Sequence, residues 1–236
     1  MVKSELIRRS PLRIFEKSIH GGLGKGNIGV IASRKGVGKT ACLVHIATDK
    51  LLQDKQVLHV SFSARVDHII TWYEDIFREI SRKRNLESAV EVHDELVKKR
   101  IIMNFNQKGM GTEHILQSLR AMIKDGHFAA DCVIFDGYDI DIATSEDIKA
   151  IGDFARETNL EIWFSLSLKG EEPLFDDRGL PRVVLPYLDA IAVLVTLRFI
   201  EGYVHLQVVK DRDTVDVRDM NLRLDPKTLL IAEIEE

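Results

Sequence analysis

Cysteine is scarce in this chain of 236 residues, which contains only Cys42 and Cys132. Neither has a second cysteine or a histidine at the spacing of a metal site, and each lies inside an apolar run. The sequence therefore favours two buried free thiols in a cytoplasmic protein over the alternatives of a disulfide or a metal centre. The eight histidines are scattered and form no H-E-x-x-H motif, so we expect them to be structural or surface residues.

Long apolar segments are absent as well. The longest apolar run, AIAVLVTL at residues 190–197, is much shorter than the roughly 18 residues of a membrane-spanning helix. Residues 1–17 contain no apolar core of the kind found in secretory signals. We therefore expect no membrane partner.

Excess positive charge is also missing, because 33 Lys and Arg face 37 Asp and Glu, for a net charge of −4. No overall basic field would therefore attract nucleic acid. The composition is typical of a soluble globular protein, and the length suffices for one large domain with a full core. We expect that domain at residues 20–236, after an N-terminal segment, residues 1–19, that either packs on a neighbouring subunit or forms a local helix.

Apolar runs alternate with helical patterns over most of the chain. Strands are predicted at 27–33, 56–62, 100–105, 131–136 and 161–168, and helices at 39–52, 66–98 with a break at 82–85, 111–126 with Thr112 as N-cap, and 145–158. A polar loop with three of the five prolines follows, and then strands at 190–197, 203–210, 216–225 and near the end of the chain. This order predicts an α/β fold whose mostly parallel sheet has a C-terminal antiparallel extension.

The segment SRKGVGKT, residues 33–40, fits the phosphate-loop pattern G-x-x-x-x-G-K-[ST] except at its first position, where Ser33 replaces glycine. A non-glycine residue there would cost about 1 kcal/mol or more if the backbone required a positive φ. The loop lies between a predicted strand and a predicted helix, the setting in which such loops bind phosphate. The alternative is an ordinary glycine turn before a helix.

Each residue type in this loop suits a phosphate ligand. Gly36 and Gly38 let the backbone approach the phosphates, Lys39 would reach the β- and γ-phosphates, and Thr40 would offer its hydroxyl to Mg²⁺. Arg34 and Lys35 either add charge near the phosphates or lie on the solvent side. We expect ATP to contact Ser33, Arg34, Lys35, Gly36, Val37, Gly38, Lys39, Thr40 and Ala41.

A second acidic element follows at DCVIFD, residues 131–136. Four apolar residues end in Asp136, which resembles the Walker B pattern, in which a carboxylate at a strand end holds Mg²⁺. A buried strand that ends in Asp by chance is the alternative. Asp139 and Asp141 lie just beyond and are interpreted as loop residues.

Taken in order, these pieces resemble the RecA-like P-loop ATPases, in particular the KaiC-like and DnaB-helicase-like branch. The similarity covers roughly residues 12–215 and rests on IHGGLGKGNIGVIASRKGVGKT (19–40), GKTACLVHIA (38–47), LHVSF (58–62) and VVKDRD (208–213). It implies a RecA-like three-layer sandwich and a homo-oligomer, such as a hexameric ring or a filament, with Mg·ATP at subunit interfaces. The DnaB-like group also tolerates a non-glycine residue at the position of Ser33.

The same resemblance implies roles for two basic residues. Lys210 and Arg212 match the family's K-x-R element, whose cations would reach a neighbour's γ-phosphate as trans fingers. The alternative is a solvated turn between two strands.

Two positions depart from the family. Its catalytic glutamate is expected at Ser63 or Ala64, and neither can orient water as a carboxylate does; Asp67 is the nearest acid and a weak candidate base. Relatives often carry Gln where this chain has Ser165 and Ser167. The sequence thus predicts an ATP-binding KaiC-like protein with slow or absent hydrolysis, regulatory or scaffolding in role, whose protein partner it does not name.

The alternative is an active DnaB- or RecA-like ATPase that acts on single-stranded nucleic acid. The loop at 169–182, where such relatives bind DNA, carries four acidic residues against three basic ones, which argues against this activity. The clusters RKR (82–84) and KKR (98–100) are interpreted as solvated helix ends and are the best remaining nucleic-acid candidates. A small-molecule kinase is a third and weaker interpretation, because no arginine-rich lid is evident.

Overall fold

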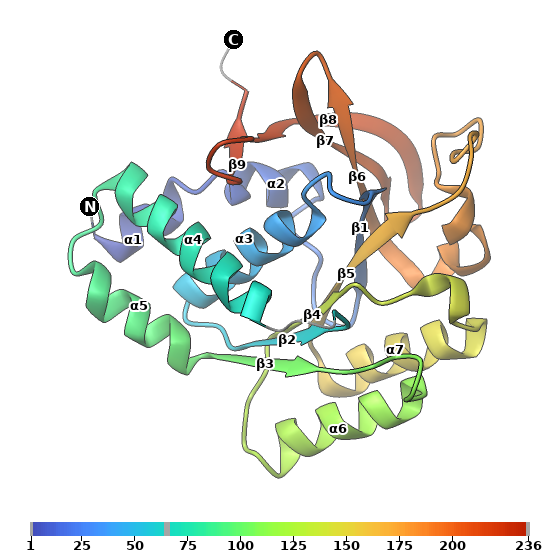
Figure 1. Cartoon of the computed structure of the whole chain (residues 1–236), viewed down its shortest axis with the longest axis horizontal. Coiled ribbons are helices and arrows are strands. Elements are labelled where there is room, and N and C mark those ends of the chain that lie inside the picture. Colours follow the sequence, from blue (N-terminus) through green and yellow to red (C-terminus); the bar gives the residue numbers. More distant parts are fainter. Residues whose placement is uncertain (1, 64–66, 235–236) are drawn as a thin grey trace.

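A computed structural model describes residues 2–63 and 67–234. In this part of the chain nine strands form one mixed sheet in the order β3-β2-β4-β5-β1-β6-β7-β8-β9 (Figure 1). The strands are β1 (Ile28–Arg34), β2 (Val57–Ser61), β3 (Arg100–Asn104), β4 (Cys132–Asp136), β5 (Glu161–Leu168), β6 (Ile191–Ile200), β7 (Tyr203–Asp211), β8 (Thr214–Leu224) and β9 (Ile231–Glu233). The pairs from β3 to β6 are parallel and the pairs from β6 to β9 are antiparallel. The predicted α/β class and C-terminal antiparallel extension are confirmed.

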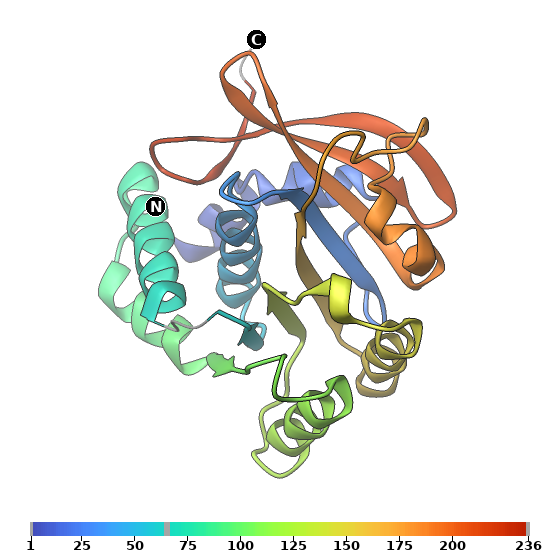
Figure 2. The same ribbon diagram turned by 45° about the vertical axis from the view of Figure 1, so that its right-hand side comes forward.

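Helices cover both faces of the parallel part of the sheet and make a three-layer α/β arrangement (Figure 2). One face carries α1 (Lys3–Arg8), α2 (Leu12–Ser18), α3 (Lys39–Leu52), α4 (Asp67–Arg84) and α5 (Ala89–Lys98). The other face carries α6 (Thr112–Lys124), α7 (Ser145–Thr158) and the 3₁₀ helices η1 (Ile140–Ile142) and η2 (Arg182–Ala190). The apolar stripes of the long helices face these two cores, as their spacing predicts.

The N-terminal segment forms two short helices that pack on the core of their own chain. Leu12 and Phe15 are each 2 % exposed. The Phe15 ring lies 5.7 Å, centroid to centroid, from the ring of Trp163 on β5. Of the two alternatives for residues 1–19, the structure therefore shows local helices.

The predicted N-cap of α6 is wrong. Gly111 precedes the helix, and Thr112 is its first residue. The Thr112 hydroxyl lies 2.9 Å from the hydroxyl of Tyr138 in a buried contact, so its polar group is satisfied across the core instead of at the helix end.

The polar loop after β5 contains a helix that the pattern did not predict. Pro186 stands inside η2, a 3₁₀ helix, and the presence of three prolines favoured an irregular loop in this region. The loop leads to β6, which pairs in parallel with β1 before the antiparallel strands begin.

Among the described residues, no helix is long and apolar enough to cross a membrane. Both cysteines are buried and free, as predicted.

Candidate functional site

The glycine loop joins the carboxyl end of β1 to the start of α3 (Figure 1). Ser33 is still part of β1 and pairs in register with Ser167 of β5, so its backbone is extended. The positive φ angles occur three and five residues later, at Gly36 (84°) and Gly38 (117°). The serine therefore carries none of the backbone strain that a non-glycine would suffer at a left-handed position.

The N-terminal end of α3 points into this loop. Its first helical hydrogen bond runs from the N–H of Cys42 to the carbonyl of Gly38, at 3.0 Å. The N–H groups of Lys39, Thr40 and Ala41 precede that bond and lie outside the helical ladder. Together with the positive end of the helix dipole, they form the kind of backbone cradle that binds anions.

The side chain of Lys39 folds back over the loop and is only 7 % exposed. Its Nζ donates to the carbonyl oxygens of Ser33, at 3.2 Å, and Arg34, at 2.9 Å. Burial lowers the pKa of Lys39, and the charge of Asp136 partly opposes that shift. Because these carbonyl acceptors are uncharged, the positive charge stays available to an anion.

Thr40 and Asp136 meet at the carboxyl edge of the sheet. The hydroxyl of Thr40 lies 3.0 Å and 3.2 Å from the two carboxylate oxygens of Asp136. The Ser165 hydroxyl donates to the same carboxylate at 2.6 Å and accepts the N–H of Gly137 at 2.8 Å. The structure thus brings together the two predicted magnesium residues, and it places Ser165 of β5 on their carboxylate.

His59 lies beneath the same carboxylate and was missed by sequence reasoning. Its Nε2 is 4.0 Å from Oδ2 of Asp136, and its Nδ1 is 3.0 Å from the hydroxyl of Tyr73. Complete burial lowers the pKa of His59 to about 4, so the ring is neutral at physiological pH. A histidine inside the apolar run of β2 was the available signal, since β2 pairs with β4 and brings the two residues together.

The positions expected for a catalytic acid follow β2. Ser63 is exposed, and its carbonyl accepts a hydrogen bond from the Asn104 side chain at 2.7 Å. Ala64 lies outside the described residues. Asp67 is exposed and begins α4. Of the two expected positions only Ser63 is described, and it carries a hydroxyl in place of the water-orienting carboxylate that the resemblance implies.

The two basic residues inside the loop are both exposed. Arg34 forms an ion pair with Glu172 at 2.9 Å, in the loop after β5. For Arg34, the structure therefore favours the solvent-side alternative. Lys35 is exposed on the glycine turn itself.

Lys210 and Arg212 lie at the edge of the sheet opposite to the glycine loop. Lys210 donates to the carbonyl of Ile191, the first residue of β6, and burial lowers its pKa. The Arg212 guanidinium donates to the carbonyls of Ile19, at 3.0 Å, and Gly22, at 2.8 Å, just before β1. The seven residues of β1 separate the two edges by roughly 20 Å. Neither cation can reach the glycine loop of its own chain.

Two of the three basic residues in the loop at 169–182 pair with nearby acids. Lys169 lies 2.7 Å from Asp139 and 2.9 Å from Asp141, and Arg178 pairs with Asp176 at 3.0 Å. Asp139 and Asp141 thus belong to the turn around η1 and pair with Lys169, in agreement with their interpretation as loop residues.

Within the described residues no group of three or more His, Cys, Asp or Glu side chains could hold a metal ion. The magnesium prediction therefore rests on Thr40 and Asp136 together with the phosphates of the ligand.

Comparison with protein-family models and with curated proteins finds no match to this chain.

Proposed function

We propose that this protein is a RecA-like, KaiC-like ATP-binding protein that holds Mg·ATP at its glycine loop, hydrolyses it slowly or not at all, and acts as a regulatory or scaffolding component. The observation that carries the proposal is the contact between Thr40 and Asp136, 96 residues apart in sequence and 3.0 Å apart in space. An ordinary glycine turn would have no reason to meet a strand-end carboxylate. Hydroxyl and carboxylate oxygens are the ligand types that Mg²⁺ prefers.

In the proposed complex each side chain has one task. The N–H groups at the start of α3 bind phosphate oxygens, and Lys39 exchanges its carbonyl partners for the β- and γ-phosphates. Thr40 and Asp136 hold Mg²⁺, which neutralises part of the phosphate charge. Ser165 fixes the carboxylate of Asp136 from the neighbouring strand.

Hydrolysis needs a group that orients the attacking water, and general-base catalysis of this kind typically contributes 10²- to 10⁴-fold to a rate. The serine hydroxyl at position 63 cannot take that role at neutral pH. We therefore expect turnover well below the ordinary enzyme range of about 1 s⁻¹ and above.

The positions of Lys210 and Arg212 favour a homo-oligomer. Lys210 and Arg212 lie too far from their own loop to act on it, so they could serve only the nucleotide of another copy. In the single chain Arg212 is held by backbone carbonyls, and service as a trans finger would require it to leave them.

The test is a calorimetric titration of Mg·ATP into the wild-type protein and a Lys39→Ala variant. We expect one magnesium-dependent site per chain that the variant loses. Lys124→Ala is the matched control, since this exposed lysine lies on α6, on the other face of the sheet. Equal Mg·ATP affinity in the wild type and Lys39→Ala would contradict the proposal.

A turnover assay with size determination, with and without Mg·ATP, tests the rest of the proposal. Slow turnover and nucleotide-dependent assembly are the expected results. Turnover near 1 s⁻¹ that single-stranded DNA or RNA stimulates at low salt would instead establish the motor alternative, which no contact in the described residues specifically favours.

A further inference from the structure

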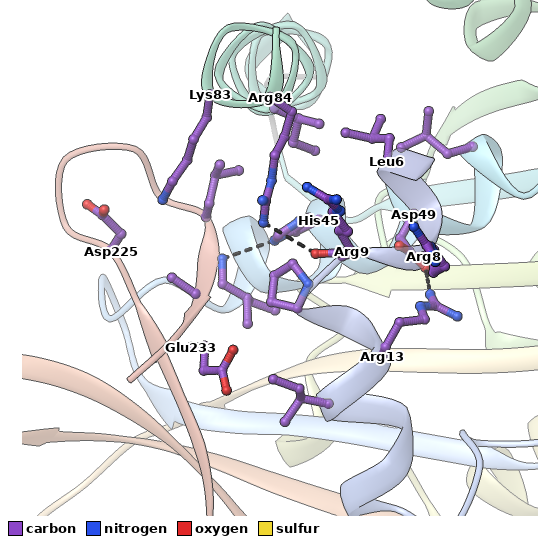
Figure 3. A pocket seen from close by; sticks show the side chains of 18 of the residues that line it. Leu6, Arg8, Arg9, Arg13, His45, Asp49, Lys83, Arg84, Asp225 and Glu233 are labelled. Atoms are coloured by element: carbon purple, nitrogen blue, oxygen red, sulfur yellow. Dashed lines mark hydrogen bonds and ion pairs between the residues drawn. The ribbon is translucent and has the colours of Figure 1, made fainter. Parts of the chain in front are cut away.

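A cavity of about 750 Å³ opens between the N-terminal segment, the C-terminal end of α4 and the strands β8 and β9 (Figure 3). Part of its wall is apolar, formed by Leu6, Ile14, Leu52, Ile80, Leu230 and Ile231. Its lining includes no residue of the glycine loop. The cavity is therefore a separate feature that the proposed function does not use.

Positive charge dominates the lining. Of the described residues, six cations line the cavity (Arg8, Arg9, Arg13, Lys83, Arg84 and Arg223) against three carboxylates (Asp49, Asp225 and Glu233). Figure 3 shows Arg84 extending from α4 to the N-terminal segment, and Lys83 extending from the same helix on the side of Asp225. Cations from separate elements converge here in a protein whose net charge is negative.

The carboxylates nearby offset only part of this charge. Asp49 is bonded by Arg13, and Arg9 pairs with Glu5 at 2.8 Å, outside the lining. The Arg84 guanidinium donates to a neutral group, the carbonyl of Arg9, at 3.3 Å. Gathering like charges in one cavity is unfavourable unless an anion joins them.

His45 adds a neutral donor to the wall. The Nδ1 of its buried ring accepts the N–H of Ile231 at 3.0 Å, and burial lowers the pKa of this ring to about 4. A neutral ring that accepts at Nδ1 carries its proton on Nε2. The wall therefore combines charged donors, a neutral donor and apolar surface.

We propose that this cavity binds an organic phosphate of about nucleotide size. Arginine forks match phosphate oxygens in geometry, and several of them together suit a ligand with more than one phosphate charge. The volume lies within the range of about 300–1,000 Å³ that small-molecule sites occupy. The apolar wall would cover the organic part of the ligand, which inorganic phosphate lacks.

The site is distinct from the glycine loop, although α3 carries parts of both. His45 and Asp49 stand six and ten residues after Lys39 in that helix, so they lie roughly 9 Å and 15 Å along its axis from the loop. Loss of Lys39 therefore leaves the cavity intact, and binding at the two sites can be measured separately.

The experiment uses the Lys39→Ala protein in EDTA and titrates two probes, pyrophosphate and ADP, by calorimetry. We expect saturable binding of one ADP per chain, tighter than that of pyrophosphate. Lys83→Ala/Arg84→Ala in the same background should weaken ADP binding by at least about tenfold, because charge-assisted hydrogen bonds to phosphate are lost. Arg8→Ala, on the opposite wall, should weaken it independently.

The matched control is Arg78→Ala/Arg82→Ala, which removes two exposed cations of the same helix that do not line the cavity. It should leave ADP affinity within about twofold, as surface substitutions of solvated charges usually do. Absence of saturable ADP binding, an equal loss in the control, or equal affinity for the two probes would overturn the proposal.

Discussion

Because His45 is buried, we predict that this protein loses stability in mildly acidic solution. Its folded-state pKa is about 4, against 6.5 for an unperturbed histidine, because burial disfavours the charged ring. Between these values the unfolded chain binds a proton at this position and the folded chain does not. Acid therefore favours unfolding, and stability falls as the pH drops from 6.5 toward 4.

The magnitude follows from the difference of about 2.5 pKa units at 1.36 kcal/mol per unit, or about 3 kcal/mol for this residue alone. This is a large fraction of the 5–15 kcal/mol that stabilises a typical domain. The matched variant is His45→Asn, whose side-chain oxygen can still accept the N–H of Ile231 but carries no titrating group.

The assay is urea unfolding of both proteins between pH 7.5 and pH 4. His59 and other buried groups titrate in both proteins, so the difference in unfolding free energy isolates His45. We expect the wild type to lose about 3 kcal/mol more than the variant across this range. Parallel stability curves would refute the assignment of a neutral, buried ring at this position.

Two further predictions concern the candidate site, and a third concerns Arg212 at the opposite edge of the sheet. Ser33→Gly should raise ATP affinity less than about twofold and cost about 0.5–1 kcal/mol in urea unfolding, because Ser33 is extended in β1 and glycine weakens strands; a large gain in affinity would show that the serine strains the loop. Asp136→Asn should leave the fold intact but weaken magnesium-dependent ATP binding by on the order of 10- to 100-fold in calorimetry; unchanged magnesium dependence would contradict its role. Arg212→Ala should destabilise the single chain by about 2 kcal/mol, since hydrogen bonds from the charged guanidinium to the Ile19 and Gly22 carbonyls are lost; unchanged urea unfolding would show that these bonds contribute nothing.

Local patterns were sufficient for most of the fold. The alternation of apolar strands with helical stripes predicted each of the long helices and the order of strands along the chain, because hydrophobic periodicity reports directly on burial. The break expected at 82–85 lies later, since α4 continues through Arg84 and α5 begins at Ala89. The patterns did not predict that β6 pairs in parallel with β1. That pairing depends on the path of the loop after β5, which contains η2 and is dominated by residues with no periodic signal.

The residues of the candidate site that belong to a sequence motif were predictable. Those that join the site only through tertiary contacts were not. Lys39, Thr40 and Asp136 were found from spacing alone, and the structure gathers them at one edge of the sheet. His59 and the contact of Ser165 with Asp136 were not, because both arise from the neighbouring strands β2 and β5 on either side of β4. Strand order is a property of the whole sheet, which no local pattern specifies.

Ser33 and Ser63 both depart from the patterns that the sequence resembles, with unequal consequences. Ser33 lies in the extended strand β1, and Gly36 and Gly38 supply the left-handed backbone conformation that the turn needs. After β2 the last residue described before the gap, Ser63, is exposed and carries no carboxylate. Around Asp136 the chain positions Thr40 and Ser165 directly on the carboxylate. If the loop binds Mg·ATP as we propose, these contacts together with a serine at position 63 favour holding the nucleotide over hydrolysing it.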